Sequence, residues 1–371
     1  MTTTQTASHT TADPTLPLLF QPYSLRGLTL RNRIAVSPMC QYACEARDGM
    51  ATPWHLVHLG ARAVAGAGLV IAEASAVTPE GRITPQDLGI WSDAHADALA
   101  PVVDFMHQHG AAAGIQLAHA GRKASTNRPW EGRGALDDAH GGWTPVAPSG
   151  LAFPTYREPH GLTPAEIGAT VEAFAAATRR AHAAGFDFIE LHAAHGYLLH
   201  QFHSPLSNQR TDGYGGSFEN RVRFTLECVT AMRAAWPTEK PISVRLSCTD
   251  WVPGGWDIED TVRLALLLRE AGVDIIDASS GGSSPDQKIA LSPGYHVPFA
   301  ERIRREVAMP VAVVGLITQP EHAEQILQAG QADLILLGRE LLRNPEFPQQ
   351  AAKALGVPDA AYWPDQYLRA K

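Results

Sequence analysis

The chain has 371 residues, of which 45% are hydrophobic and 18% charged, and its formal net charge at pH 7 is −8. This length is large for an ordinary domain but normal for an α/β barrel with insertions. Because no block or stripe of Lys and Arg occurs, the composition argues against nucleic acid and anionic membranes as partners.

The two ends and the cysteines carry little information about function. Residues 1–15 are rich in Thr, lack Lys and Arg and lead into no apolar signal-peptide core. We therefore predict a disordered tail over residues 1–16 and a single domain over 17–371. The four cysteines have no disulfide-framework spacing, and no apolar run approaches the roughly 20 residues of a membrane span. These features predict a cytoplasmic protein.

Apolar, β-prone runs alternate with helical patterns along the rest of the chain. The predicted strands are Arg33–Met39, Leu69–Val77, Ala111–His119, Phe186–His192, Ile242–Ser247, Asp274–Ser280, Pro310–Gly315 and Ala332–Gly338. The predicted helices that follow them are Trp54–Gly66, Asp93–His109, Thr163–Ala184, Phe218–Trp236, Ile258–Ala271, Phe299–Val307, Pro320–Gln328 and a helical tail from Glu340. Eight such units in order predict a closed (β/α)8 barrel, that is, a TIM barrel. The alternative, a doubly wound sheet, would need a Gly-rich fingerprint after the first strand, where the sequence reads SPMC.

Two long segments follow strands and should therefore lie on the ligand-binding face of the barrel. The segment Ala124–Leu162, between the third strand and its helix, is rich in Gly, Pro and Trp. A loop of this length inside a compact domain is typical of a lid or a binding loop. The second segment is His195–Ser217.

Three hydrogen-bonding side chains stand where the fourth strand opens into its loop. His192 ends the strand, and His195 and Tyr197 follow at once. In parallel α/β folds, ligands bind at the carboxyl ends of strands. Taken alone, the two histidines are equally compatible with a structural role.

Arg245 lies inside the apolar fifth strand, where a charge is costly unless it is paired. A structural interpretation pairs Arg245 with Glu73 or Glu190 in the barrel core. Gln116 lies late in the third strand, close to the expected barrel mouth. Both side chains could contact a polar heterocycle.

Glycines follow the seventh and eighth strands, at Gly315 and Gly338. Each one alone is adequately explained by a tight turn. Together they occupy the two loops that usually hold a phosphate in this fold, and Arg339 could add a charge-assisted contact. With the thiol of Cys40 after the first strand, this set of residues fits flavin mononucleotide (FMN).

Two other classes of function stay open at this point. A metal-dependent hydrolase could use His192, His195 and Cys40 or a carboxylate as zinc ligands, but it would leave Arg245, Gln116 and the glycines unexplained. A non-catalytic flavin carrier would leave Tyr197 beside the histidines without a purpose. An iron–sulfur relative is disfavoured because four scattered cysteines supply no cluster motif.

The sequence resembles the Old Yellow Enzyme family of FMN-dependent ene-reductases, in its bacterial, thermophilic-like branch. The resemblance extends from Leu19 to Arg369. It rests on SPMCQYAC at Ser37–Cys44, QLAHAGRKA at Gln116–Ala124, HAAHGYLLHQFHSPLSNQRTDGYGGSFENR at His192–Arg221, PGYHVPFA at Pro293–Ala300 and GRELLRNP at Gly338–Pro345.

The resemblance implies a role for each matching residue. Contacts with FMN would come from Ser37, Pro38, Met39, Cys40, Ala72, Gln116, His192, Arg245, Gly315, Gly338 and Arg339. Substrate would be bound by Tyr42, His192, His195 and Arg369, with Tyr197 as the proton donor. Arg369 would reach the active site of a neighbouring subunit, which implies a homodimer or homotetramer.

The resemblance also implies the reaction. NADPH (or NADH) would reduce FMN, and an activated alkene, an α,β-unsaturated carbonyl or nitro compound, would then take its place in the same site. The histidines would polarise the substrate oxygen, and Tyr197 would protonate the carbon α to the activating group.

Overall fold

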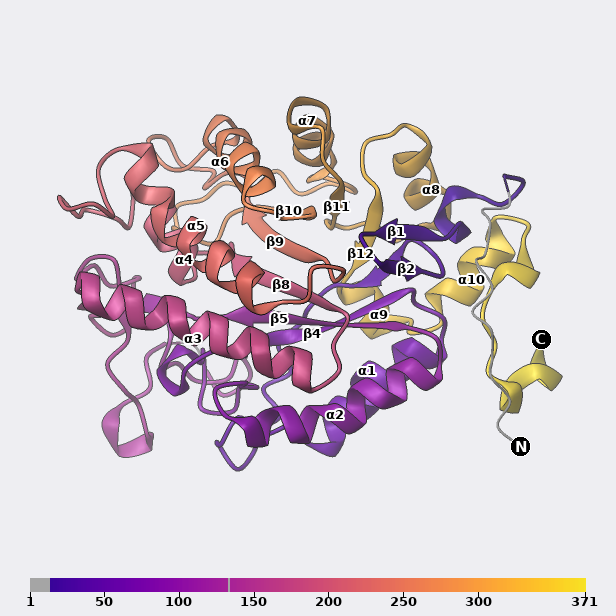
Figure 1. Ribbon diagram of the computed structural model, residues 1–371, viewed down its shortest axis with the longest axis horizontal. Helices are drawn as coiled ribbons and strands as arrows, with labels where there is room; N and C mark the ends of the chain where they lie inside the picture. Colours follow the sequence, from indigo (N-terminus) through magenta and orange to yellow (C-terminus); the bar gives the residue numbers. More distant parts are fainter. Residues whose placement is uncertain (1–13, 133) are drawn as a thin grey trace.

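The computed structural model describes residues 14–132 and 134–371. The predicted disordered tail, residues 1–16, lies outside this range except for 14–16, which form a turn. Eight parallel strands close into a barrel in the order β10-β11-β12-β3-β4-β5-β8-β9 (Figure 1). The strands are β3 (Ile34–Val36), β4 (Leu69–Ala76), β5 (Ala112–Ala118), β8 (Phe188–Ala193), β9 (Ile242–Ser247), β10 (Ile275–Ser279), β11 (Val311–Val313) and β12 (Leu334–Leu337). The predicted (β/α)8 barrel is confirmed.

Helices follow the strands and surround the barrel. They are α1 (Pro53–Val64), α2 (Asp93–Gln108), α3 (Pro164–Ala183), α5 (Phe218–Ala235), α6 (Ile258–Glu270), α7 (Val297–Val307), α8 (Pro320–Gln328), α9 (Arg339–Arg343) and α10 (Phe347–Ala354). The start of α3 is encoded locally. The Thr163 side chain accepts a hydrogen bond from the Glu166 N–H, the Glu166 carboxylate accepts one from the Thr163 N–H, and Pro164 takes the first helical position.

A hairpin that the sequence analysis did not predict closes the amino-terminal end of the barrel. It consists of β1 (Tyr23–Leu25) and β2 (Leu28–Leu30), paired antiparallel. Leu25 and Leu30 form one buried cluster with the first residues of several strands, among them Leu69 and Phe188. The hairpin therefore plugs one end of the barrel and leaves the carboxyl ends of the strands to form a cavity.

The two long segments contain short elements of their own. In the first, β6 (Val146–Ala147) pairs in parallel with β7 (His160–Gly161). In the second, α4 (Leu198–His203) begins immediately after Tyr197. Both segments follow strands, as predicted, and α4 and the β1–β2 hairpin lie on opposite sides of the barrel strands (Figure 1).

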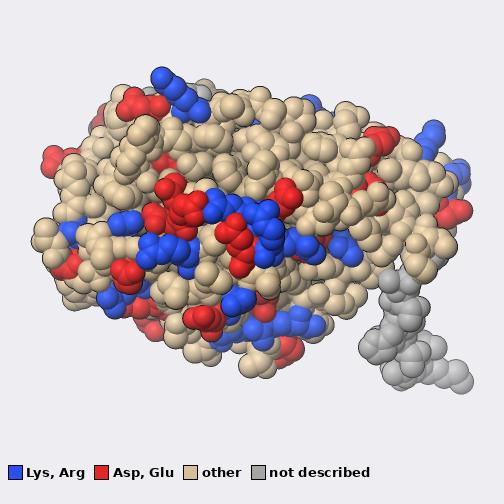
Figure 2. Space-filling model, turned by 90° about the horizontal axis from the view of Figure 1, so that it is seen from above, with Lys and Arg blue, Asp and Glu red and all other residues tan. Residues whose placement is uncertain are grey.

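Charged side chains of both signs are interleaved across the face shown in Figure 2. Among the described residues, no helix combines the length and the apolar character that crossing a membrane requires.

The barrel plug gives a first testable prediction. Leu30 is 1% exposed, so Leu30→Ala should lower the free energy of unfolding by about 2–5 kcal/mol through lost burial and the remaining cavity. Urea denaturation measures this change. Thr29→Ala, on the exposed face of the same strand, is the matched control and should cost less than about 0.5 kcal/mol. Equal losses in the two variants would show that the hairpin does not plug the barrel.

Candidate active site at the carboxyl end of the barrel

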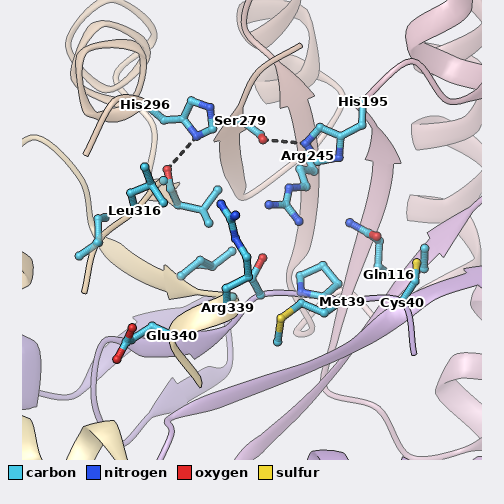
Figure 3. Close-up of a pocket in the computed structure, with 18 of the residues that line it drawn as sticks. Met39, Cys40, Gln116, His195, Arg245, Ser279, His296, Leu316, Arg339 and Glu340 are labelled. Atoms are coloured by element: carbon cyan, nitrogen blue, oxygen red, sulfur yellow. Dashed lines mark hydrogen bonds between the residues drawn. The ribbon is translucent and has the colours of Figure 1, made fainter. Parts of the chain in front are cut away.

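A cavity of about 360 Å³ opens at the carboxyl ends of the strands. Figure 3 shows side chains from separate strands and loops pointing into it. Most of the predicted site residues meet on its walls: Ser37, Pro38, Met39, Cys40, Gln116, His192, His195, Tyr197, Arg245, Gly315, Gly338 and Arg339. Three predicted residues, Ala72, Tyr42 and Arg369, are absent from the walls. These twelve residues are spread over about three hundred positions of the sequence. The closed barrel brings them together, because they lie at or after the carboxyl ends of its strands.

Arg245 is paired with Asp277, and its predicted structural partners were wrong. The two residues stand opposite each other on β9 and β10, with 3.0 Å between Arg245 Nε and Asp277 Oδ2. Both are buried. Figure 3 shows the guanidinium group of Arg245 reaching into the cavity. Among the described residues, Arg245 donates no hydrogen bond, so the contact with Asp277 is an ion pair and one side of a buried cation is left for a ligand.

Glu190 positions Gln116 instead of pairing with Arg245. Gln116 Nε2 donates to Glu190 Oε1 at 2.8 Å, and Ser243 Oγ donates to Glu190 Oε2 at 2.9 Å. This fixes the amide of Gln116, whose oxygen accepts no hydrogen bond within the described part of the chain. Burial, together with the charge of Asp277, raises the pKa of Glu190 to about 8.

A β-bulge in β4 explains why Ala72 is not on the cavity wall. The pairing of β4 with β5 shifts register between Ala72 and Ala74. Without this shift, Ala72 and Ala74 would face the same side of the sheet. Ala72 is packed in the layer between strands and helices, whereas Ala74 lines the cavity. We therefore replace Ala72 with Ala74 in the candidate site.

The bulge also turns Glu73 away from the barrel interior. Glu73 Oε2 accepts the Gln41 N–H at 2.8 Å, and its other oxygen lies 3.3 Å from His55 Nε2. A buried carboxylate thus fixes the segment that carries Cys40 and Tyr42. Glu73 was predicted only as a partner of Arg245, and its positioning role could not be read from the sequence.

His192, His195 and Tyr197 form one aromatic group on the wall. The His192 ring centroid lies 5.1 Å from that of His195 and 4.9 Å from that of Tyr197, and both contacts are edge-on. The Ala194 N–H donates to His192 Nδ1 at 3.3 Å, which leaves Nε2 to carry the proton. His195 Nε2 lies 2.7 Å from Ser279 Oγ.

The protonation states of this group follow from its burial. Burial, followed by the charge of Arg245, holds the pKa values of both histidines well below their usual range, so the rings are neutral at pH 7. Burial raises the pKa of Tyr197 well above its usual range, so the phenol keeps its proton. A neutral imidazole can donate one N–H hydrogen bond to a ligand oxygen. A protonated phenol can give its proton to a nearby basic carbon. The group therefore suits a ligand that carries both an oxygen atom and a carbon that takes up a proton.

The opposite wall carries the glycine loops. Gly315, with φ +136°, follows β11, and Gly338 precedes α9. Figure 3 shows the side chain of Arg339 pointing into the cavity toward that of Arg245. Two guanidinium groups therefore serve one cavity, which suits an anionic ligand.

The sequence analysis missed several wall residues, among them Ser279 and His296, which hold other parts of the site. Ser279 holds the ring of His195, and His296 lies between Ser280 and the loop after β11. His296 Nδ1 donates to the carbonyl oxygen of Val314 at 2.8 Å, and a Cβ on Gly315 would lie 3.1 Å from the same nitrogen. The sequence analysis noted the motif PGYHVPFA, but the sequence does not indicate that its His296 contacts the loop after β11.

The remaining predicted residues lie as follows. Burial, followed by the charges of Asp87 and Glu73, raises the pKa of the Cys40 thiol, which is therefore protonated at pH 7. Tyr42 contacts Trp130 of the long loop edge-on, with ring centroids 5.7 Å apart. Arg369 is exposed in the C-terminal segment and does not reach the cavity of its own chain.

The zinc hypothesis finds no ligand set. Within residues 14–132 and 134–371, no group of three or more His, Cys, Asp and Glu side chains is placed to hold a metal ion. The histidines instead contact each other, Ser279 and Tyr197.

The fold and the cavity together define a barrel enzyme whose open end suits an anionic, heterocyclic ligand. The family model described as "NADH:flavin oxidoreductase / NADH oxidase family" matches residues 18–357. The chain belongs to this family and is an oxidoreductase, which confirms the resemblance to Old Yellow Enzymes.

Similar proteins agree with this assignment. An NADPH dehydrogenase of Geobacillus thermodenitrificans is 50% identical over 356 residues, which cover 95% of this chain and 98% of the relative. The solved structure of morphinone reductase is similar with a TM-score of 0.76 at 29% identity, covering 91% of this chain and 90% of that one. An Old Yellow Enzyme homologue from Zymomonas mobilis gives a TM-score of 0.76 at 28% identity, covering 91% and 93%.

The close approach of two loops beside His195 yields a second prediction. A Cβ at Gly282, where φ is +94°, would lie 2.4 Å from the backbone carbonyl of His195. Gly254 also has positive φ, +75°, but has no atom within 4 Å of such a Cβ. Gly254→Ala should cost about 1 kcal/mol of stability from backbone strain alone. Gly282→Ala should cost about 1–3 kcal/mol more in urea denaturation, because backbone atoms must move. Equal costs would contradict the packing described.

Proposed function

We propose that the protein is an FMN-dependent NADPH oxidoreductase that reduces the C=C bond of α,β-unsaturated carbonyl or nitro compounds. One observation carries the proposal. A single cavity unites an open cation and amide, Arg245 and Gln116, with a neutral His-His-Tyr group. The relatives named NADPH dehydrogenase support the choice of nicotinamide.

The cavity fits FMN by the chemistry of its open groups. The unpaired N–H groups of Arg245 and the free amide oxygen of Gln116 match the acceptors and the N–H of a flavin pyrimidine edge. Backbone N–H groups at Gly315 and Gly338 and the side chain of Arg339 would hold the phosphate. Ser37, Pro38, Met39, Cys40, Ala74 and His192 would contact the ring.

The bound flavin supplies the hydride chemistry, accepting a hydride from NADPH and passing it to the substrate. His192 and His195 would donate hydrogen bonds to the carbonyl or nitro oxygen of the alkene. These bonds stabilise the negative charge that develops on this oxygen as the β carbon receives hydride. Tyr197 would then give its proton to the α carbon and regain one from solvent, which completes the addition of H⁻ and H⁺ across the C=C bond.

NADPH and the alkene would bind in turn to the same hydrogen-bond donors, because the cavity offers one set of them. Tyr42, beside Trp130, would shape the substrate side of the cavity. We also propose that Arg369 completes the site of a neighbouring subunit in a homodimer or homotetramer. Support comes from its exposed C-terminal segment, where Tyr367 and Leu368 are 53% and 51% exposed.

Product analysis tests the proposed reaction. Purified protein loaded with FMN should oxidise NADPH in the presence of 2-cyclohexenone and form cyclohexanone in equal amount. NADPH oxidation without a saturated product would contradict alkene reduction. Formation of the saturated product by protein stripped of flavin would contradict the proposed dependence on FMN.

The proton-donor role of Tyr197 gives a third prediction. Tyr197→Phe should slow alkene reduction by about 10²–10⁴-fold, the usual contribution of a general acid. Flavin reduction by NADPH should change little, because that step needs no proton at the α carbon. Stopped-flow absorbance separates the two half-reactions.

The matched control is Tyr214→Phe, because the Tyr214 hydroxyl bonds Glu227 on α5 outside the cavity. It should leave both half-reactions unchanged. If Tyr197→Phe slowed both half-reactions equally, the assigned role would be wrong.

A further inference from the structure

Lys123 lies beside the candidate site but belongs to no group discussed so far. It follows β5 in a short 3-10 turn, Gly121–Lys123. Its Nζ donates to the carbonyl oxygen of His195 at 2.8 Å and to that of Gly282. Two backbone carbonyls from different loops therefore converge on one ammonium group, which offsets their mutual repulsion.

The backbone of His195 adopts a strained conformation that contacts on several sides hold in place. His195 has φ +57°, a conformation that is unfavourable for a residue with a side chain. Its N–H donates to Ser247 Oγ at 2.9 Å, and its ring lies 2.7 Å from Ser279 Oγ. The bond from Lys123 supplies the restraint on the third side of the residue. Removing it should allow the peptide, and with it the imidazole, to turn.

An aromatic ring of the long loop covers the same ammonium group. Lys123 Nζ lies 4.5 Å from the ring centroid of Phe153 and 5.7 Å from that of Tyr197. Both distances lie in the range of cation–π attraction. Arg122 also reaches this loop, donating to the carbonyl oxygen of Leu151 at 3.3 Å. The long loop is thus seated on the side chain that holds His195.

We propose that Lys123 is a positioning residue. Its ammonium group, bound to the carbonyl oxygens of His195 and Gly282 and covered by Phe153, orients the His195 imidazole toward the substrate oxygen and couples that orientation to the seated long loop. This inference rests on the proposed function, because it assumes that His195 binds the substrate oxygen.

The chain provides a matched control at the other end of the barrel. Lys240 Nζ donates to the carbonyl oxygen of Phe186 at 2.6 Å and lies 5.2 Å from the Trp236 ring centroid. It makes the same kinds of contact as Lys123 but precedes β9, far from the cavity. Lys240→Met therefore measures the structural cost of losing such a lysine without touching the site.

The first test is binding of a phenol to FMN-loaded protein, followed by its charge-transfer absorbance. Lys123→Met should raise the Kd on the order of tenfold, the effect of losing one charge-assisted hydrogen bond. Lys123→Arg, which keeps the charge and the donors, should restore most of the affinity. Lys240→Met should leave the Kd unchanged.

The outcomes separate the two proposals. Wild-type protein that retains no flavin and binds no phenol would contradict the proposed function. Wild-type protein that binds phenol, with Lys123→Met and Lys240→Met binding as tightly, would overturn only the role of Lys123. If Lys123→Met does not fold, Lys123→Arg and Phe153→Ala carry the test.

A double-mutant cycle tests the coupling to the long loop. Phe153→Ala should weaken phenol binding less than Lys123→Met does. Because Phe153 acts through Lys123, the double variant should bind no more weakly than Lys123→Met alone. Independent, additive losses would overturn the coupling.

A pH profile adds a readout that a merely structural lysine would not move. Burial, followed by the charge of Arg122, lowers the pKa of Lys123 to about 7. The other titratable groups facing the ammonium are His192 and His195, which are neutral at pH 7, and Tyr197. The ammonium is present below pH 7 and lost above it, so affinity for an un-ionised phenol should fall as pH rises through about 7. Lys123→Arg should abolish this fall; an identical fall in that variant would overturn the assignment.

Discussion

A buried guanidinium group that is only partly neutralised shapes the open end of this barrel. Asp277 offsets the charge of Arg245 on one side, at 3.0 Å, and burial leaves no water on that side to help. The other donors of Arg245 face the cavity. Removing an ion from water costs several kcal/mol unless its partners replace the lost hydration. A ligand that supplies acceptors at this point therefore binds to a charge already held in place.

The same positive charge acts on the neighbouring strand. His192 stands opposite Arg245 in the pairing of β8 with β9. Burial and this charge keep His192 and His195 neutral, while burial keeps Tyr197 protonated. The three side chains thus present two neutral imidazole rings and one protonated phenol to the cavity. Glu190 and Glu73 contribute from outside the cavity, by fixing Gln116 and the Cys40 segment.

The sequence predicted the barrel well because its signals are local. Short apolar strands, helix caps such as Thr163 with Glu166, and the order of eight units all lie in continuous stretches of chain. Because most of the predicted site residues lie at or after the carboxyl ends of strands, the closed barrel places them around one cavity. The β1–β2 hairpin escaped notice because two three-residue strands carry almost no periodicity.

The errors share a different cause, which is that the decisive contacts are not local. A β-bulge at Glu73 turns Ala72 and Ala74 to opposite sides of the sheet, and nothing in the run LVIAEASAV marks it. Asp277 was overlooked as the partner of Arg245 because cross-strand register is set by the closed barrel. Lys123 was present in a recognised motif, but its role depends on carbonyl groups over 70 residues away.

An anaerobic absorption experiment tests the central claim, that one cavity holds a flavin and serves both half-reactions. Purified protein is incubated with FMN, freed of excess cofactor, reduced with NADPH and then mixed with 2-cyclohexenone. We predict that the visible flavin bands are retained, bleach with NADPH and return when the enone is added. Protein that stays colourless after incubation with FMN, or bound flavin that NADPH leaves oxidised, would contradict the account.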